Sequence, residues 1–244
     1  MGSQSRSIRG LGTDMKYMGS KNRIAKHILP IMLQAARERG ITKWVEPFVG
    51  GGNMIDKVPA EFERVGYDLN EHVIMAMIDI RDNAHSLPDN VSEEEYNKIK
   101  GRQPESITSW VRIACSFAGI FESKLAADKI GVRNYAGEAK RNAINQSAKI
   151  QGVSFHQSSY IDLSLKDSII YCDPPYQGTS GYKTGAFDHE DFFQWCREQA
   201  KNNIVFISEY DAPFEEVWRG EIKTNFSSTR SKATHNAVEK LYRC

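Results

Sequence analysis

The motif Asp-Pro-Pro-Tyr at residues 173–176 directly follows the apolar run of residues 169–172, and it constrains the fold more than any other feature. An apolar run of this length is typical of a buried strand, and two successive prolines cannot continue a hydrogen-bonded ladder. The chain must therefore leave a sheet at the carboxyl end of that strand, where open α/β sheets bind ligands. The carboxylate, proline carbonyl and aromatic ring suit a flat heterocycle with an exocyclic amine, although the same residues can form an ordinary turn.

A second motif, VEPFVGGG at residues 45–52, follows Trp44 and a predicted helix. Three successive glycines after an apolar strand allow a tight turn and a close approach of the backbone to a ligand. The segment lacks the Lys-Ser/Thr pair of a phosphate-binding P-loop and the G-x-G-x-x-G spacing of a dinucleotide site. It predicts either a ligand loop of another kind or a glycine-rich loop without a ligand.

A third motif, residues 64–70, ends a further short strand at Asp68. An acidic residue about 20 residues beyond a glycine turn is placed to bind ribose hydroxyls. Asp68 is equally suited to cap a helix over the apolar segment 73–80, and the two uses are compatible.

Together these motifs resemble those of the Dam-type, D12-class DNA adenine-N6 methyltransferases. Residues 16–21 (KYMGSK) look like the family's N-terminal cofactor motif, residues 45–52 like its glycine motif, Asp68 like its ribose-binding acid and residues 173–176 like its catalytic motif. The strand at residues 204–210 and the C-terminal segment also fit, the latter through Ser227, Ser228, Arg230, Lys232, Glu239, Lys240 and Leu241. The resemblance covers the chain from Met15 onward, and it is closest in kind to the small stand-alone methylases of phages and mobile elements.

The resemblance implies S-adenosylmethionine as the cofactor. The residues that would bind it are Tyr17, Lys21, Glu46, Pro47, Phe48, Gly50, Gly51, Gly52, Asp68 and Asp173. The catalytic residues that it implies are Asp173, Pro174, Pro175 and Tyr176. Neither a metal ion nor a covalent nucleophile is needed.

The implied chemistry is direct methyl transfer to the adenine N6 amine, whose lone pair is delocalised into the ring. Hydrogen bonds to Asp173 and to the Pro174 carbonyl would favour a more pyramidal nitrogen and stabilise the developing positive charge. Holding the two reactants in line supplies further acceleration. Because the target adenine lies inside a duplex, it must flip out, with Tyr176 stacking on it.

The segment from Tyr96 to Ile150 carries a local charge excess of about +6, although the whole chain has a net charge of +1. Such an excess suits the neutralisation of phosphates, while a solvated helix face is the alternative. By resemblance this region reads the target sequence, and the candidates for base or phosphate contacts are Lys124, Arg133, Asn134, Arg141 and Asn142. Family members that methylate GATC carry different residues at the places of 117–121 and 131–135, so this chain is not predicted to read GATC.

The predicted fold class is α/β, a Rossmann-like methyltransferase sheet with helices on both faces and a mostly helical insertion for DNA recognition. Predicted helices cover 21–39, 70–82, 92–100, 104–121, 136–150 and 189–201; predicted strands cover 43–48, 62–68, 153–156, 168–172 and 203–207, with a terminal pair of strands. Residues 15–82 and 151–244 would form the cofactor-binding catalytic domain, and residues 83–150 the inserted target-recognition subdomain. Residues 1–14 are polar and are expected to be a disordered extension or a tag, with Met15 a plausible natural start.

Four scattered cysteines without metal-ligand spacing predict reduced thiols, and neither a signal peptide nor a membrane span is visible. We expect a cytoplasmic enzyme of a bacterial or phage-infected cell, with double-stranded DNA as its partner and no membrane association. No motif decides whether a cognate restriction endonuclease accompanies it.

The sequence therefore predicts a site-specific DNA adenine-N6 methyltransferase. A cytosine-N4 methyltransferase is the first alternative because it performs the same amine chemistry, although those enzymes more often carry serine in place of Asp173. A catalytically inactive DNA-binding module of the same fold is the second alternative, against which the intact glycine loop, Asp68 and Asp173 argue. An RNA adenine is a weaker substrate candidate.

Overall fold

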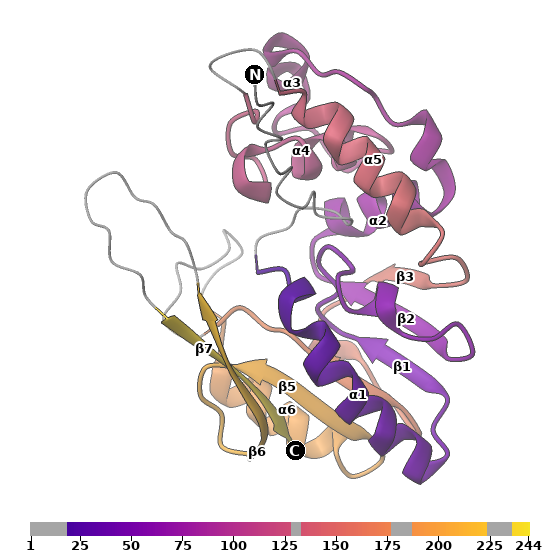
Figure 1. Cartoon of the computed structure of the whole chain (residues 1–244), viewed down its shortest axis with the longest axis vertical. Coiled ribbons are helices and arrows are strands. Elements are labelled where there is room, and N and C mark those ends of the chain that lie inside the picture. Colours follow the sequence, from indigo (N-terminus) through magenta and orange to yellow (C-terminus); the bar gives the residue numbers. More distant parts are fainter. Residues whose placement is uncertain (1–18, 128–132, 177–186, 224–235) are drawn as a thin grey trace, which may run out of the picture. The chain divides into compact units, whose positions relative to one another are not determined.

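The computed structural model describes residues 19–127, 133–176, 187–223 and 236–244 of the chain (Figure 1). Among the described residues, 75–151 with Gly19 and Ser20 form one compact unit, and those of 21–74 and 152–244 form a second. We call these the helical unit and the sheet unit. The division at residue 75 falls inside a helix, eight residues before the predicted start of the insertion at residue 83. The expected extension at residues 1–14 lies outside the described residues.

Within the described residues the sheet unit holds one seven-stranded sheet in the order β3-β2-β1-β4-β5-β7-β6. The parallel strands are β1 (Lys43–Glu46), β2 (Glu63–Asp68), β3 (Ser154–Gln157), β4 (Ile169–Cys172) and β5 (Ile204–Glu209). The last two strands, β6 (Glu215–Lys223) and β7 (Asn236–Arg243), pair antiparallel with each other, and β7 pairs antiparallel with β5. The predicted α/β fold class and the terminal pair of strands are confirmed.

The order of the strands reverses between β1 and β4, which lie side by side although β2 and β3 come between them in the chain. A reversal of this kind opens a crevice at the carboxyl ends of the two strands, where doubly wound sheets bind ligands. The glycine motif follows β1 and the Asp-Pro-Pro-Tyr motif follows β4. Two motifs far apart in sequence therefore follow the carboxyl ends of two adjacent strands.

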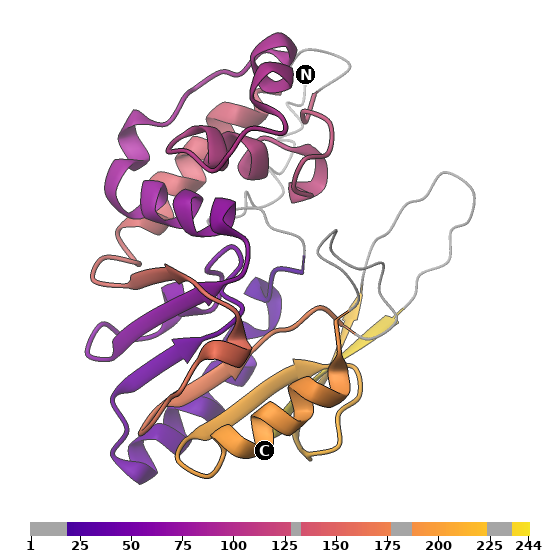
Figure 2. The same ribbon diagram turned by 180° about the vertical axis from the view of Figure 1, so that it is seen from behind.

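Helices cover both faces of this sheet, as Figures 1 and 2 show for α1 (Asn22–Arg39) and α6 (His189–Gln199). The buried residues of α1 recur at three- and four-residue spacing and make one apolar stripe: Ile24, Ala25, Ile28, Leu29, Met32, Leu33, Ala35 and Ala36. The helix begins one residue after Lys21, so the same packing that buries α1 fixes the place of that lysine.

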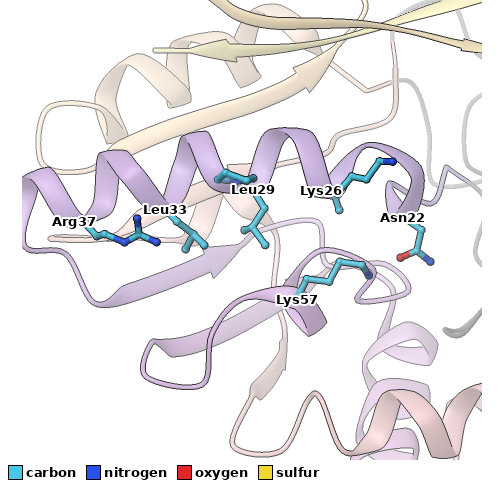
Figure 3. Close-up of a pocket in the computed structure, with 8 residues that line it drawn as sticks. Asn22, Lys26, Leu29, Leu33, Arg37 and Lys57 are labelled. Carbon is cyan, nitrogen blue, oxygen red and sulfur yellow. The ribbon is translucent and has the colours of Figure 1, made fainter.

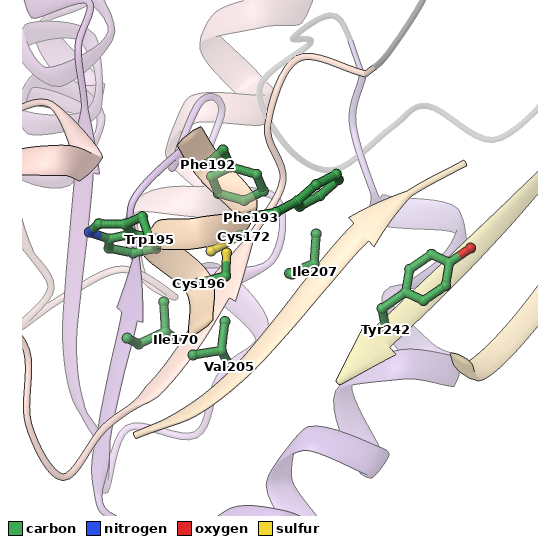
Figure 4. Close-up of a cluster of buried hydrophobic side chains, with 9 residues drawn as sticks. All are labelled: Ile170, Cys172, Phe192, Phe193, Trp195, Cys196, Val205, Ile207 and Tyr242. Carbon is green, nitrogen blue, oxygen red and sulfur yellow. The ribbon is translucent and has the colours of Figure 1, made fainter. Parts of the chain in front are cut away.

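The second face packs α6 against β4 and β5 in a cluster of buried side chains (Figure 4). Phe192 of α6 is fully buried there, against Ile170 of β4 and Val205 of β5. Burial of one such side chain contributes about 1.5–3 kcal/mol. The side chain of Asp188 caps α6 by accepting hydrogen bonds from the backbone N–H groups of Glu190 and Asp191, both at 3.0 Å.

The helical unit is built on α3 (Glu93–Ile99), α4 (Thr108–Ala114), α5 (Tyr135–Ser147) and the greater part of α2 (Glu71–Asn83). The 3₁₀ turns of the described chain are Ile55–Lys57, Ala84–Ser86, Phe117–Gly119 and Tyr160–Asp162. Ser92 and Glu95 form a reciprocal capping box at the start of α3. A guanidinium–carboxylate pair is largely buried inside the unit, between Arg112 and Glu122.

The predicted helix over 104–121 is wrong in extent, because α4 covers only residues 108–114. Asp79 of α2 accepts hydrogen bonds from the Ser106 hydroxyl and the Ile107 N–H, both at 2.6 Å, and Ile107 adopts a φ of +63° immediately before the helix. Beyond the helix, Ala118 also has a positive φ, and the Phe117 N–H bonds to the Lys124 carbonyl instead of continuing the helical ladder. The apolar pattern could not show these long-range bonds.

In the described part of the chain, no helix is both long and apolar enough to span a membrane.

Candidate active site

The glycine loop is tied to the end of β2 by two hydrogen bonds. The Val49 N–H donates to the Tyr67 carbonyl at 2.8 Å, and the Gly50 N–H donates to Oδ2 of Asp68 at 3.1 Å. Gly50 and Gly52 have φ values of +47° and +65°, a backbone conformation that side chains with a Cβ rarely adopt. The loop therefore turns sharply just beyond β1, as its three glycines predicted.

A fourth glycine, Gly66 in the middle of β2, lets this loop lie close to the sheet. A Cβ at Gly66 would lie 2.7 Å from Cγ2 of Val49 and 3.0 Å from Cδ1 of Phe155 on β3. These distances are shorter than a normal carbon–carbon contact, so only glycine leaves room for Val49. The strand and the loop are packed as one piece.

Asp68 lies at the carboxyl end of β2, beside the glycine loop. Its Oδ1 accepts a hydrogen bond from the Asn70 N–H at 2.9 Å, and burial raises its pKa to about 6 in spite of the two backbone donors. The cap of α2 is Asn70, whose Oδ1 accepts from the His72 N–H at 3.0 Å. Asn70, and not Asp68, therefore caps α2. The binding of ribose by Asp68 stays a prediction.

The catalytic motif begins where β4 ends. Oδ1 of Asp173 lies 3.1 Å from Nζ of Lys21, which precedes α1. Burial raises the pKa of Asp173 to about 6, although the Lys21 ammonium acts in the opposite direction and nearby Glu239 adds to the rise. Burial alone would lower the pKa of Lys21, but the carboxylates of Asp173 and Glu239 raise it above its ordinary value. This carboxylate is therefore partly buried, charged above about pH 6, and held by one ammonium.

Tyr176 closes the motif and makes contacts on three sides. Its hydroxyl donates to Oε2 of Glu239 on β7 at 2.8 Å, and Nζ of Lys21 lies 4.3 Å from the centre of its ring. The Tyr210 ring meets it edge-on, with the centroids 4.6 Å apart. Burial raises the pKa of Tyr176 well above its ordinary value, so the hydroxyl stays protonated and can donate to Glu239.

Aromatic rings surround Phe48, which lies in the loop after β1. Its ring centroid lies 5.3 Å from Tyr160, 5.9 Å from Phe187 and 5.6 Å from Phe192. Phe48 and Phe187 are only partly buried, so the group presents a flat apolar wall beside the glycine loop. Such a wall suits the face of a purine ring. Tyr160 follows β3, and Phe187 lies at the start of the segment that leads into α6.

Glu46 and Pro47, both predicted to contact the cofactor, are buried beneath the loop. Oε1 of Glu46 accepts a hydrogen bond from the Trp44 indole N–H at 2.9 Å, and burial raises the Glu46 pKa well above its ordinary value. The contact of Tyr17 with the cofactor falls on a residue outside the described part of the chain.

Sequence reasoning missed several residues that meet at this site. Glu239 was noted only as part of a resembling segment. However, its side chain shares a strand face with buried Leu241, which is an unusual place for an acid. His189, at the start of α6, carries no sequence signal that sets it apart, but its Nε2 lies 3.0 Å from the Pro175 carbonyl oxygen and 3.6 Å from Oε2 of buried Glu209. The carbonyl can only accept, so His189 donates to the turn.

The family model of the D12 class N6 adenine-specific DNA methyltransferases matches residues 17–106. The similarity to this family therefore covers 90 of the 244 residues of the chain. The match confirms the predicted resemblance and the predicted enzyme class, an S-adenosylmethionine-dependent methyltransferase. It covers the N-terminal motif, the glycine loop and Asp68, and it ends before β4.

Comparison with solved structures finds distant likenesses only. The rRNA methyltransferase AviRa from Streptomyces viridochromogenes is 11% identical, with 93% of this chain and 86% of that chain covered and a TM-score of 0.44. A protein from Thermoplasma acidophilum is 11% identical, with 93% and 97% covered and a TM-score of 0.39. No curated protein sequence matches the chain. At these scores the likenesses do not bear on the activity of the methyltransferase.

The residues of the methyltransferase fit the cofactor that the family implies. The glycine loop offers a close backbone approach, Asp68 offers a carboxylate beside it, and the wall around Phe48 offers a purine contact. Near Asp173 the carboxylates of Asp173 and Glu239 face one ammonium, that of Lys21, so the local charge is negative. A negative site attracts the positively charged sulfonium of S-adenosylmethionine.

A separate pocket of about 330 Å³ lies along α1 (Figure 3). It is lined by Asn22, Ala25, Lys26, Leu29, Pro30, Leu33, Arg37 and Lys57. None of these is a predicted cofactor-binding or catalytic residue, and we assign it no ligand. Among the described residues, no group of three or more histidine, cysteine, aspartate or glutamate side chains could hold a metal ion.

Two asparagines that we had predicted to contact DNA have structural roles in the helical unit. Asn134 caps α5, since its Oδ1 accepts from the Gly137 N–H at 2.8 Å while its Nδ2 donates to the Asp89 carbonyl at 3.0 Å. Asn142 lies on the inner face of α5 and is only 5% exposed. Its position does not favour a contact with DNA, because Asn142 lies one turn from buried Gln146 on the same face of α5.

The three basic residues predicted to contact DNA differ in the interactions that they make within the protein. Both nitrogens of the Arg133 fork donate to Glu138, at 2.7 and 2.6 Å, and the Glu138 carboxylate raises the Arg133 pKa. Nζ of Lys124 lies 4.9 Å from the centre of the Phe117 ring. Arg141 is exposed on α5. Of the three, Arg141 is placed most openly for a phosphate.

The positive excess of residues 96–150 is partly neutralised by acids that precede the segment. Nζ of Lys140 lies 2.8 Å from Oδ2 of Asp89, and Nζ of Lys98 lies 2.7 Å from Oε1 of Glu94. Taken over residues 83–150, the excess falls to about +2. The charge pattern along the sequence therefore overstated the positive surface.

Proposed function

We propose that the protein is a site-specific DNA methyltransferase that transfers a methyl group from S-adenosylmethionine to the N6 amine of an adenine in duplex DNA. The observation that carries this proposal is the partly buried carboxylate of Asp173 at the end of β4, next to β1, the strand that leads into the glycine loop. The family match of residues 17–106 supports DNA adenine as the substrate class.

The residues proposed to act on the amine are Asp173 and Pro174. An ionised Asp173 accepts a hydrogen bond from the N6 amine, and the Pro174 carbonyl accepts a second. Both bonds draw the lone pair out of conjugation with the ring, and both strengthen as positive charge develops on the nitrogen. The carboxylate must be charged to do this, and its pKa of about 6 leaves it charged at neutral pH.

The target base must leave the helix before it can reach this carboxylate. We propose that the adenine flips out and stacks on the ring of Tyr176, which is held by Glu239, Lys21 and Tyr210. Pro175 fixes the turn that carries the ring, and the bond from His189 to its carbonyl holds that turn in place. Bound S-adenosylmethionine supplies an electrophilic methyl group, so the chain needs only to position and polarise the amine.

Recognition of a short DNA sequence is proposed for the helical unit. Lys124, Arg133 and Arg141 are the proposed contacts, while Asn134 and Asn142 are not retained. A DNA substrate would place the enzyme in the cytoplasm of a bacterial or phage-infected cell. A cognate restriction endonuclease is not part of the proposal.

The test is methylation of unmodified genomic DNA by the purified protein and S-adenosylmethionine, read by single-molecule sequencing that detects modified bases. N6-methyladenine within one short motif is the expected result, and Asp173→Ala is the matched control that should leave the DNA unmodified. N4-methylcytosine would move the assignment to the cytosine enzyme. Bound cofactor with no modified base would contradict a DNA substrate for this chain alone.

A further inference from the structure

Glu239 of β7 lies between two residues of the proposed reaction site. Its Oε2 accepts a hydrogen bond from the Tyr176 hydroxyl at 2.8 Å and lies 3.8 Å from Nζ of Lys21. The side chain is 13% exposed, so water screens these interactions weakly. Glu239 is the only acid in the sequence of β7, Asn236–Arg243.

Lys21 is shared between two carboxylates. Its Nζ is 3.1 Å from Asp173 and 3.8 Å from Glu239, and it also lies over the ring of Tyr176. The Lys21 ammonium therefore interacts with both carboxylates. If one carboxylate is removed, the ammonium interacts more strongly with the other. The interaction of Lys21 with Asp173, the proposed hydrogen-bond acceptor for the amine, therefore depends on the side chain at position 239.

Other titratable groups face this cluster from the neighbouring strands. Burial raises the pKa values of Tyr171 on β4 and Glu46 on β1 well above their ordinary values. The negative charge of Asp173 adds to both increases. Tyr210, after β5, is influenced by Glu239 and Lys21 and its pKa is also raised. The two tyrosines therefore stay uncharged near pH 7, and Lys21 and Glu239 are the charged groups that act most strongly on Asp173.

We propose that Glu239 is a positioning residue for methyl transfer: through the Tyr176 hydroxyl it fixes the ring on which the target base stacks, and through Lys21 it sets how strongly the ammonium holds Asp173. This inference rests on the proposed function, since it assigns roles at the same site. It predicts two separable effects, one on ring placement and one on the charge of Asp173.

Three substitutions separate these effects. Glu239→Gln keeps an oxygen that can accept from the Tyr176 hydroxyl but removes the charge. Glu239→Ala removes both, and Tyr176→Phe keeps the ring but removes its hydroxyl. Glu221→Gln is the matched control, because Glu221 is an exposed acid on the adjacent strand β6.

The first experiment measures kcat and KM for DNA, and Kd for S-adenosylmethionine, across pH 5 to 9. Glu239→Ala should lower kcat by about tenfold or more, the loss expected for a hydrogen bond to a charged group, and Glu239→Gln should lose less. In Glu239→Gln the acidic limb of kcat should move to lower pH, because loss of a like charge favours ionised Asp173. Glu221→Gln should leave kcat, KM and the acidic limb unchanged.

The hydrogen-bond part is tested by combining Glu239→Ala with Tyr176→Phe. If Glu239 acts on the ring through the hydroxyl, the double variant should lose much less than the product of the two single losses. Fully multiplicative losses would overturn this part of the proposal. An acidic limb that does not move in Glu239→Gln would overturn the charge part. Cofactor affinity reports whether each variant is folded, and Glu239→Gln and Tyr176→Phe carry the test if Glu239→Ala does not fold.

A second experiment does not depend on activity. Carboxyl carbons are labelled with ¹³C in the full chain, the Asp173 signal is assigned by its loss in Asp173→Asn, and its titration is followed by NMR. The Asp173 midpoint should fall in Glu239→Gln and stay unchanged in Glu221→Gln. A lower midpoint in a protein that methylates no DNA would separate failure of the proposed function from failure of this inference. An unchanged midpoint in an active enzyme would overturn the inference alone.

Discussion

Oδ2 of Asp68 accepts a hydrogen bond from the backbone N–H of Gly50 at 3.1 Å, and this bond joins the end of β2 to the loop that follows β1. The acid and the loop that we expect to hold the two ends of one ligand are thus linked before any ligand is bound. A substitution of Asp68 should therefore alter the conformation of the glycine loop, and a substitution in the loop should alter the position of Asp68. Preorganisation of this kind lowers the cost of binding.

The substitution Asp68→Ala should weaken binding of S-adenosylmethionine by about tenfold or more, because it removes both the proposed ribose acceptor and the bond that holds Gly50. Isothermal titration calorimetry at pH 7.5 measures this directly. Asp211→Ala is the control, since the Asp211 side chain is 89% exposed. An unchanged Kd for Asp68→Ala would remove Asp68 from the cofactor site.

The affinity for S-adenosylmethionine should also fall as the pH is lowered through about 6, because burial raises the pKa of Asp68 to about 6 and a protonated carboxyl accepts less well. The dependence should be smaller in Asp68→Asn, which cannot titrate at this position, and the part that remains is assigned to Asp173, whose pKa is also about 6. Calorimetry at pH 5 and pH 8 measures it. Equal pH dependence in the wild type and Asp68→Asn would assign the effect to another group.

Removal of the Asp173 carboxylate should abolish methyl transfer while leaving the fold intact. The pKa of Asp173 is about 6 in the folded chain, above the ordinary 3.8, so the folded chain binds this proton more tightly than the unfolded chain does. The free energy of unfolding should therefore fall as the pH rises from about 4 to about 6. In Asp173→Asn this contribution should be missing.

Urea unfolding at several pH values, alongside a methylation assay, measures both consequences for Asp173→Asn. Asp68→Asn is a useful comparison, because burial raises the pKa of Asp68 to a similar value. This substitution should remove a similar share of the pH dependence of the free energy of unfolding. Methylation retained by Asp173→Asn would remove the carboxylate from the mechanism. A stability profile identical to that of the wild type would show that Asp173 titrates normally.

Gly66→Ala should both destabilise the sheet unit and weaken cofactor binding, because the new methyl group would lie 2.7 Å from Cγ2 of Val49. Overpacking of this kind costs about 1–3 kcal/mol in the free energy of unfolding. The double variant Gly66→Ala with Val49→Ala removes the 2.7 Å contact but leaves Cβ of Val49 at 3.0 Å, so it should recover part of the cofactor affinity. Failure of the double variant to recover it would place the fault elsewhere in β2, at Phe155 for instance.

Arg141→Ala should weaken binding of DNA and make it less sensitive to salt, with the slope of log K against log[salt] shallower by about 1. Lys140→Ala is the matched control, because Lys140 has the same charge, is adjacent in the chain and already pairs with Asp89. Fluorescence anisotropy with a labelled duplex at several salt concentrations measures both slopes. Equal changes for the two variants would deny Arg141 a specific phosphate contact.

Much of the site could be predicted from local patterns. The two prolines after residue 172 force the chain out of the sheet wherever that strand lies, and three glycines after residue 49 force a turn. These constraints act within a few residues, so they can be recognised in the sequence before the fold is known. The order of the strands then brings both segments to the same crevice.

Contacts between distant residues could not be predicted in this way. Glu239 meets Tyr176 only because β7 inserts between β5 and β6, and His189 meets the Pro175 carbonyl only because α6 packs behind β4. The end of α4 at Ala114 likewise depends on bonds such as that from the Ala126 N–H to the Cys115 carbonyl, made by residues outside the helix. Each of these outcomes is fixed by packing and hydrogen bonds that have no signature in a short window of sequence.

The strands that flank the helical unit in the chain are neighbours in the sheet, since β2 and β3 pair from Val65 with Ser154 to Asp68 with Gln157. The chain thus departs from the sheet and rejoins it at adjoining strands. Whatever lies between those strands can be lengthened, shortened or exchanged as one continuous cassette without disturbing the pairing. Under the proposed function, exchange of this segment would change the target sequence and leave the transfer chemistry unaltered.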